Sequence, residues 1–377
     1  MPRYFCDFNS TAMFRWTLLL GAVLAVIGGT AFAQETTPPV VPDPLETSAQ
    51  ANKRALQSLQ LGLSVQGGQV VSVGAGGAVL TSTDGGETWR QTAGVPVSVT
   101  LTSVSFASQE IGVAVGHSGA ILRTEDGGQT WKKQLDGVQA ADLALQEAKE
   151  LEAAGAEGAE RALRNAEYLI ADGPDKPFLN VHFKDSQTGW AVGAYGLAMM
   201  TQDGGATWTS VTAQIPNSRG MHLYQVRSRD NLVLIVGEQG TVIVSTDGGE
   251  TFQEIETPYG GSFFGAVITR EGRALVYGLK GNAWLSNEDF STWKKTDLDQ
   301  PITVVTGAQT QNGRIFLADE AGHLLQSDDG GRSFSGFGEP VSAGATDIAL
   351  VSGQVLIIAG PRGNSRLDLS TLPKRAH

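Results

Sequence analysis

The carboxylates that could do chemistry in this chain recur in one short motif. It runs Ser or Thr, any residue, Asp-Gly-Gly, any residue, Thr or Ser, and an aromatic residue. The five aspartates are Asp84, Asp126, Asp203, Asp247 and Asp329. Regularly placed carboxylates could serve as an acid and base pair, but a carboxylate before two glycines is also typical of a tight turn. Because every copy repeats the same turn chemistry, we interpret these aspartates as structural residues.

Other candidates for catalysis or metal binding have weaker support. A sialidase needs an arginine triad, and the densest basic cluster is Arg219, Arg227 and Arg229, which solvent-exposed arginines would explain equally well. A glycosidase with two carboxylates stays open, because it is defined by a separation in space. The histidines lack metal-ligand spacing and no calcium-loop motif is present. The sequence therefore predicts no catalytic residue, no cofactor and no metal site.

The elements that carry the motif repeat with a fixed internal spacing. A glycine precedes each aromatic residue by the same distance, and Gly363 continues the series without a motif after it. The pairs are Gly77 and Trp89, Gly119 and Trp131, Gly196 and Trp208, Gly240 and Phe252, Gly281 and Trp293, and Gly322 and Phe334. A repeat of roughly 40–45 residues that is rich in short strands is typical of a β-propeller blade. We expect seven four-stranded blades over residues 55–371, with the aromatic residues buried between blades and the segment near 55–65 helping to close the ring.

The motif is that of the Asp-box, or BNR repeat, which occurs in sialidases, sortilin-type receptors and the photosystem II assembly and stability factors. The chain resembles the last family most. Val115–Trp131, Val236–Phe252 and Gly189–Gly193 carry its pattern of a hydrophobic residue, Val-Gly, two residues and Gly before the Asp-box. The resemblance implies an all-β, seven-bladed propeller of Asp-box repeats that is not an enzyme and binds another protein. The sialidases imply the alternative, a glycoside hydrolase or glycan-binding protein.

The ends of the chain and its charge bear on location and partners. Residues 1–33 combine Arg15, an apolar stretch at Trp16–Ile27 and a small-residue cleavage site at Ala31–Ala33, which predicts a signal peptide. The alternative is an uncleaved membrane anchor. The only cysteine, Cys6, lies in this segment, and the net charge of −12 without a basic run argues against nucleic acid. We expect an exported, periplasmic protein, or one anchored to the inner membrane if the signal stays.

Three segments fall outside the repeats. Residues 34–54 are rich in proline and predict an extended linker, and residues 372–377 form a basic tail. Residues 135–177 separate blades 2 and 3 and predict a helical hairpin with a loose apolar stripe that includes Leu143, Leu151 and Leu163. This hairpin could pack on the propeller rim, dock a partner helix, or be an irregular loop.

The up-and-down order of strands in a blade sorts the turns onto two faces. The Asp-box turns share one face, while the Gly-x-x-Gly turns, the connections between blades and the hairpin share the other. Turns that vary on a rigid frame are where binding is usually found. We therefore predict that the second face binds another protein, a membrane complex or transporter, and that the chain is a monomer outside that complex. The candidate partner-binding residues are Tyr195, Lys280, Arg362, Arg219, Leu143, Leu151 and Leu163.

Overall fold

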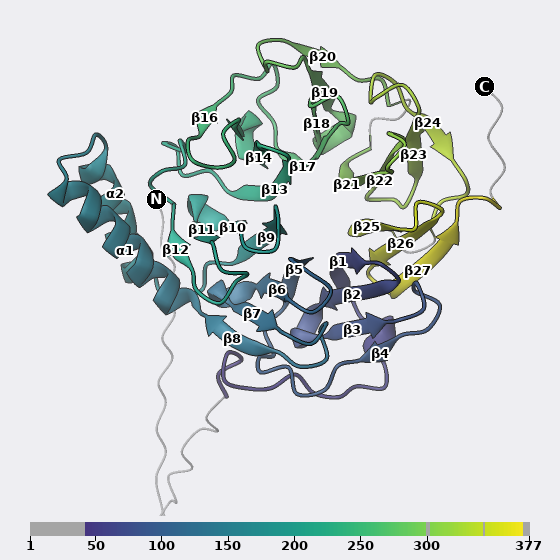
Figure 1. Ribbon diagram of the computed structural model, residues 1–377, viewed down its shortest axis with the longest axis horizontal. Coiled ribbons are helices and arrows are strands. Elements are labelled where there is room, and N and C mark those ends of the chain that lie inside the picture. Colours follow the sequence, from purple (N-terminus) through teal and green to yellow (C-terminus); the bar gives the residue numbers. More distant parts are fainter. Residues whose placement is uncertain (1–41, 299–301, 342–343, 372–377) are drawn as a thin grey trace, which may run out of the picture. The chain divides into compact units, whose positions relative to one another are not determined.

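The computed structural model describes residues 42–298, 302–341 and 344–371, which form seven antiparallel sheets arranged in a ring (Figure 1). The predictions for the signal peptide at 1–33, for residues 34–41 of the linker and for the tail at 372–377 lie outside these residues. Among the described residues, no helix combines the length and the apolar composition needed to cross a membrane.

Each sheet is one blade, and its first strand lies nearest the centre of the ring (Figure 1). Blade 1 comprises β1 (Gln60–Gln66), β2 (Gln69–Gly74), β3 (Val79–Ser82) and β4 (Arg90–Gln91). Blade 2 comprises β5 (Leu101–Phe106), β6 (Gly112–Gly116), β7 (Ile121–Thr124) and β8 (Lys132–Leu135). Blade 3 comprises β9 (Phe178–Phe183), β10 (Gly189–Gly193), β11 (Ala198–Thr201) and β12 (Thr209–Ser210). Blades 4 and 5 comprise β13 (Leu223–Arg229), β14 (Leu232–Gly237), β15 (Val242–Ser245) and β16 (Gln253–Glu254); and β17 (Phe263–Ile268), β18 (Ala274–Gly278), β19 (Ala283–Ser286) and β20 (Trp293–Lys295). Blades 6 and 7 comprise β21 (Val304–Gln309), β22 (Ile315–Asp319), β23 (Leu324–Ser327) and β24 (Ser335–Phe337); and β25 (Asp347–Val351), β26 (Val355–Gly360) and β27 (Gly363–Asp368).

The Gly-x-x-Gly turns are short 3₁₀ turns between the second and third strands of blades 1 to 5. They are η2 (Ala75–Gly77), η3 (His117–Gly119), η4 (Ala194–Gly196), η5 (Glu238–Gly240) and η6 (Leu279–Gly281). The Asp-boxes connect the third and fourth strands, so the antiparallel order puts the two sets of turns on opposite faces, as predicted. Every residue of β6, β10 and β18 is buried, because each second strand lies between two neighbouring blades.

Neighbouring blades are joined by hydrogen bonds between their innermost strands. At one position of the first strand, a polar side chain accepts the backbone N–H of the next blade. The pairs are Ser103 Oγ with Val181 N (3.3 Å), Asn180 Oδ1 with Val226 N (3.1 Å), Gln225 Oε1 with Ala266 N (2.8 Å) and Asp347 Oδ2 with Leu63 N (2.9 Å). Buried backbone donors need such partners, so these side chains fix how the blades sit against one another.

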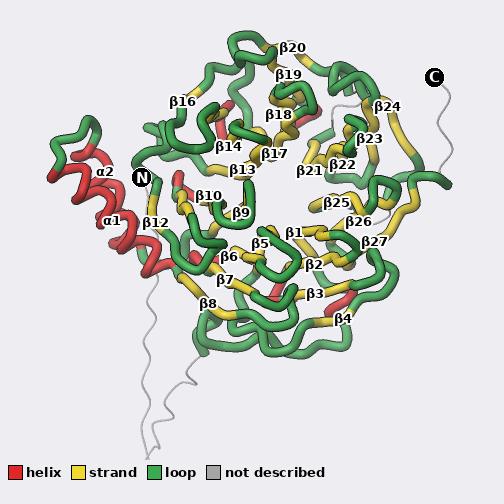
Figure 2. Tube along the Cα trace, in the orientation of Figure 1, coloured by secondary structure: helices red, strands yellow, loops and turns green. Residues whose placement is uncertain are grey.

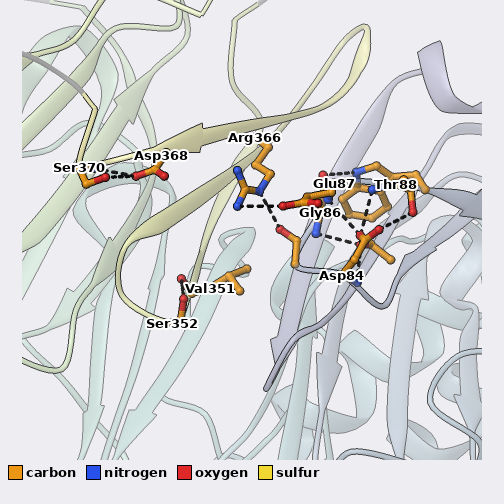
Figure 3. Close-up of polar contacts among 12 residues, drawn as sticks. Asp84, Gly86, Glu87, Thr88, Val351, Ser352, Arg366, Asp368 and Ser370 are labelled. Atoms are coloured by element: carbon orange, nitrogen blue, oxygen red, sulfur yellow. Dashed lines mark hydrogen bonds and ion pairs between the residues drawn. The ribbon is translucent and has the colours of Figure 1, made fainter.

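The Asp-box aspartates organise their own turns, as the sequence predicts. In blade 1, Asp84 Oδ1 accepts the N–H groups of Glu87 (3.1 Å) and Thr88 (2.9 Å), and Oδ2 accepts the Thr88 hydroxyl at 2.5 Å (Figure 3). The hydrogen bond from the Thr88 hydroxyl, aided by the backbone, holds the pKa of Asp84 well below its usual range. The predicted burial of the aromatic residues holds for three of the six, Trp131, Trp208 and Phe334, while Trp89, Phe252 and Trp293 are only half-buried. Trp131 is 5% exposed and lies edge-on to Phe106, with ring centroids 6.4 Å apart.

The seventh blade corrects the expectation of four strands in every blade. It has three, in the order β25-β26-β27, within the described residues, because no Asp-box follows Gly363 to turn the chain into a fourth strand. The ring closes by packing between blades 7 and 1. A Cβ on Gly363 would lie 2.0 Å from the carbonyl oxygen of Leu56, in η1 (Ala55–Gln57). Arg366 of β27 also reaches Glu87 (3.6 Å) and the Gly85 carbonyl oxygen (3.3 Å) of the first Asp-box (Figure 3).

Residues 42–54, expected to be part of an extended linker, lie against blade 1 instead. The Ser98 N–H donates to the Pro44 carbonyl (2.8 Å), and the Ala49 N–H donates to the Val95 carbonyl (2.9 Å). Leu45 is 9% exposed and packs in the same core cluster as Val95 and Val97. The connection after β4 is apolar and needs a cover, which this segment supplies.

Candidate functional site

The insertion between blades 2 and 3 is the predicted helical hairpin, α1 (Gly137–Ala153) and α2 (Ala159–Asp172), which projects from the rim of the ring (Figures 1 and 2). Asp136, directly after β8, starts α1 with a capping box. Its Oδ1 accepts the N–H groups of Val138 (3.1 Å) and Gln139 (3.2 Å), while Gln139 Oε1 accepts the Asp136 N–H (3.0 Å). Gly119 of η3 lies so close to the start of α1 that a Cβ there would be 2.4 Å from Gly137 Cα. The hairpin therefore leaves the ring on the face of the Gly-x-x-Gly turns.

A buried carboxylate fastens the hairpin to blade 3. Glu147 of α1 accepts the Ser210 hydroxyl at 2.6 Å and the Ala213 N–H at 3.3 Å. Leu143 packs against the core between blades 2 and 3, and Leu163 packs between the two helices beside Ala166. These two predicted partner-binding residues thus contribute to internal packing.

A groove runs between this hairpin and blade 3, with a cavity of about 320 Å³. We call it the hairpin groove. One side is formed by α1 and α2, and the other by Tyr195 to Leu197 and the connecting segment 212–220. Three of the predicted partner-binding residues, Leu151, Tyr195 and Arg219, line it together. The hairpin groove thus brings together three of the seven predicted partner-binding residues.

Tyr195 occupies an unusual backbone conformation at the edge of the hairpin groove. Its φ is +56°, and the corresponding residues of the other 3₁₀ turns are Gly76, Ser118, Gln239 and Lys280. A bulky residue seldom adopts this conformation without support. The Tyr195 N–H donates to His222 Nδ1 (3.1 Å), the two rings meet edge to face at 4.8 Å, and Lys176 Nζ lies 5.6 Å from the tyrosine ring centre. The ring is nevertheless 59% exposed, so it is held in place and presented to solvent.

The charged groups of the groove differ in how well they are paired. Lys176 contacts the carboxylate of Asp175 and lies 3.8 Å from Asp172. The hydrogen bond to Asp175 outweighs burial and raises the pKa of Lys176, so this side chain stays charged. Arg219 has one loose ion pair, 3.4 Å from Glu254. Arg161 makes no ion pair with any residue that the structure describes.

The remaining predicted candidates lie elsewhere. Lys280, in η6 of blade 5, and Arg362, between β26 and β27, are exposed on the same face but do not line the groove. Arg227 contacts Asn180 (3.1 Å) and Arg229 contacts Gln309 (3.2 Å), so these two and Arg219 hold separate partners and form no arginine triad.

A different arginine cluster appears on the Asp-box face. Arg270, Arg273, Arg314 and Arg332 line a pocket of about 420 Å³ between blades 5 and 6. The four arginines come from three different turns, so their spacing in the sequence could not have predicted the cluster. Ion pairs already occupy two of them: Arg314 lies 2.6 Å from Asp328, and Arg273 lies 3.6 Å from Glu288. Over the described part of the chain, no group of three or more His, Cys, Asp or Glu side chains could hold a metal ion.

Comparison with known proteins gives consistent matches. The model of the family described as photosynthesis system II assembly factor YCF48 matches residues 168–262. The photosystem II assembly lipoprotein Ycf48 of a Synechococcus species is 25% identical over 157 residues, which are 41% of this chain and about half, 47%, of that relative.

Solved structures share the fold. A structure of YCF48 bound to D1 peptide has a TM-score of 0.61 at 19% identity and covers 87% of this chain and 99% of its own. YCF48 from Cyanidioschyzon merolae has a TM-score of 0.60 at 15% identity, covering 84% and 97%. A xyloglucanase of family GH74 from Xanthomonas campestris has a TM-score of 0.59 at 11% identity, covering 86% and 53%. The prediction of an all-β, seven-bladed fold is thereby confirmed, and so is the predicted resemblance: the chain is similar to the photosystem II assembly factor YCF48 in sequence over residues 168–262 and in fold.

Proposed function

We propose that this protein is a non-enzymatic, protein-binding propeller that acts as an assembly or accessory factor for a membrane complex or transporter of the cell envelope. The observation that carries the proposal is the hairpin groove, where a supported and exposed tyrosine, apolar side chains and incompletely paired arginines lie together. Aromatic residues and arginines on a rigid frame are the groups that most often dominate protein interfaces. The similar proteins also support a role in protein binding, since one solved YCF48 structure holds a D1 peptide.

Export is part of the proposal. An envelope partner requires that the chain leave the cytoplasm, and the sequence pattern of residues 1–33 would provide the signal. Cell fractionation, with mass spectrometry of the mature N-terminus, tests this directly. A cytoplasmic protein that keeps residue 1 would contradict it.

Removing the hairpin tests the binding surface. The two ends of the insertion already touch, because a Cβ on Gly137 would lie 2.2 Å from the Pro174 carbonyl oxygen. A short Gly/Ser linker in place of residues 138–172 should therefore leave the seven blades folded. We expect the partner that co-purifies with the full chain after mild crosslinking to be lost.

A point variant covers the case in which the deletion perturbs blade 3. Tyr195→Gly removes the exposed ring and adopts the positive φ without strain, as Gly76 does in η2, so it should keep the melting temperature while weakening capture of the same partner. If both variants keep the partner and a charge reversal on the Asp-box face loses it, the binding surface has been assigned to the wrong face.

The arginine cluster between blades 5 and 6 supports a second candidate, a glycan-binding protein or glycoside hydrolase. The GH74 xyloglucanase shares the fold alone, so this candidate depends on the four arginines. We expect no hydrolysis of fluorogenic sialosides or aryl glycosides by the purified protein. Turnover that disappears in an Arg270→Ala variant would instead favour the second candidate.

A further inference from the structure

The apolar surface that the chain exposes is concentrated around the hairpin. Five large hydrophobic side chains are exposed among the described residues, and four of them belong to the hairpin or adjoin it: Val138, Tyr168, Ile170 and Tyr195. Tyr168 (68% exposed) and Tyr195 line the groove itself. Exposed aromatic side chains grouped beside a groove mark an interaction surface better than scattered ones do.

The hairpin groove follows one face of α2. Arg161, Asn165, Tyr168 and Asp172 all line it, and their spacing places them along one side of the helix. Leu151 of α1 lies on the same side of the groove, and Leu197 and Ile215 of blade 3 lie opposite. A segment laid along this face would contact α1 and α2 as the third helix of a small bundle, which is the helix-in-groove mode of recognition.

Addition of a strand is a poorer fit at this place. The outer strand of blade 3, β12, is only two residues long, and α1 already covers it through Glu147 and Ser210. The walls of the groove therefore offer side chains and no free sheet edge. Side-chain recognition at one-turn spacing is what a helix provides.

The charged side chains that line the groove determine which polar side chain a bound segment should carry. Arg161 on α2 and Arg219 on the connecting segment line the groove from opposite walls, and both have unused capacity for an anion. Three carboxylates also line the groove: Glu147 accepts hydrogen bonds from Ser210 and Ala213, Asp172 lies 3.8 Å from Lys176, and the third is Glu157. The position between the two arginines is therefore complementary to an acidic side chain, and electrostatic complementarity of this kind sets specificity.

We propose that the hairpin groove binds one amphipathic helix of the partner protein, which seats two apolar side chains one turn apart beside Tyr168 and Tyr195 and places an acidic side chain between Arg161 and Arg219. This inference rests on the proposed protein-binding function and adds the chemistry of the partner segment. Tyr195 needs no reordering to bind, because His222 and Lys176 already hold its ring.

The test uses the full chain and synthetic, end-blocked alanine-based peptides of about 18 residues, long enough to form helix. Each carries two leucines four positions apart, followed one turn later by Glu in one peptide and Lys in the other. A third peptide has the leucines and Glu with a central proline. We expect fluorescence anisotropy to show binding of the Glu peptide and at least tenfold weaker binding of the Lys and proline peptides, a difference of about 1.4 kcal/mol.

Reversing the charge of the two groove arginines tests whether they recognise the peptide or only support the fold. The double variant Arg161→Glu with Arg219→Glu should lose the Glu peptide by at least tenfold and gain the Lys peptide. The matched control is Arg164→Glu, on α2 outside the groove and 3.8 Å from Glu160, which should bind all three peptides as the wild type does.

Three results would overturn the inference: no binding of the Glu peptide to the wild type, equal binding of the proline peptide, or a double variant with unchanged preference. Partner capture that depends on the hairpin, combined with an unchanged peptide preference, would reject this inference and leave the proposed function standing. If the double variant exchanges its peptide preference but partner capture does not depend on the hairpin, this inference stands and the proposed function is rejected.

Discussion

At the scale of single residues, the Asp-box stabilises the fold through two groups, a carboxylate that accepts hydrogen bonds from its turn and an aromatic ring that packs between blades. Asp126 accepts the N–H groups of Gln129 (3.0 Å) and Thr130 (2.9 Å), while Trp131 fills the space between blades. Trp131→Ala should lower the free energy of unfolding by about 3–5 kcal/mol. Asp126→Ala should lower it by about 1–3 kcal/mol through unpaired turn amides. Urea denaturation measures both.

Blade 5 supplies a control for that comparison, because its segment Ser286–Trp293 lacks the Asp-Gly-Gly of the Asp-box. Trp293 is only partly buried, and its indole Nε1 has no hydrogen-bond partner among the described residues. Trp293→Ala should therefore destabilise less than Trp131→Ala. Equal losses for the two tryptophans would mean that the motif does not decide how well its aromatic residue packs.

His182 gives the fold a predicted dependence on pH. Burial, with a smaller contribution from the positive charge of Arg227, lowers the pKa of His182 from 6.5 to about 3. In that interval the unfolded chain binds a proton and the folded chain does not, so the fold loses stability as pH falls. The Asp-box carboxylates lose their contribution only below their unfolded pKa of 3.8.

Between pH 6.5 and 3.8 two carboxyl groups act beside the histidine: burial raises the pKa of Asp347 above 3.8, and the hydrogen bond from Arg123 lowers the pKa of Glu125 from 4.5. The contribution of His182 is therefore the difference in slope between the wild type and a His182 variant. His182→Gln should flatten the dependence of the unfolding free energy on pH in that window, as measured by urea denaturation at several pH values. A variant whose slope equals that of the wild type would exclude His182 as its source.

At the scale of elements, one buried carboxylate hydrogen-bonds the hairpin to blade 3. Glu147 holds Ser210 and Ala213 of blade 3, so Glu147→Ala should make local opening of α1 and α2 easier by about 1–3 kcal/mol. Hydrogen exchange should then speed up over residues 137–172 and stay unchanged in β5 and β6. Glu150→Ala, an exposed position on the same helix, is the control and should change neither region. Faster exchange throughout the ring would contradict a local role.

What the sequence could predict depends on how local each feature is. The blades and the Asp-box turns were predictable because Gly119, Asp126 and Trp131 lie within one repeat and carry its whole signal. The hairpin was predictable from composition and glycine placement. The contact of Glu147 with Ser210 and the arginine pocket of blades 5 and 6 were not, because they join residues that are distant in the chain. Leu163 and Tyr195 were equal candidates in the sequence, and only packing distinguishes the half-buried leucine from the exposed tyrosine.

At the scale of the whole molecule, the ring depends on the contact between blades 7 and 1. Asp347 accepts the Thr306 hydroxyl (2.8 Å) from blade 6 and the Leu63 N–H (2.9 Å) from blade 1, so it links three blades. Asp347→Ala leaves both donors unpaired and should lower the free energy of unfolding by about 1–3 kcal/mol. Asp368 lies on the outer strand of the same blade, and among the described residues its carboxylate accepts hydrogen bonds only from Ser370. Asp368→Ala should therefore have little effect. Equal losses in calorimetry would place the weak point of the ring elsewhere.

We predict that the hairpin face of the whole ring binds a protein and that the Asp-box face does not. Site-specific photo-crosslinking in the native cell tests this most directly, with a photoreactive phenylalanine placed at Tyr168, at Tyr195 or, on the Asp-box face, at Glu125. We expect Tyr168 and Tyr195 to crosslink to the same protein and Glu125 to give no such product. A product from Glu125, with none from Tyr168 or Tyr195, would show that the protein binds on the Asp-box face instead.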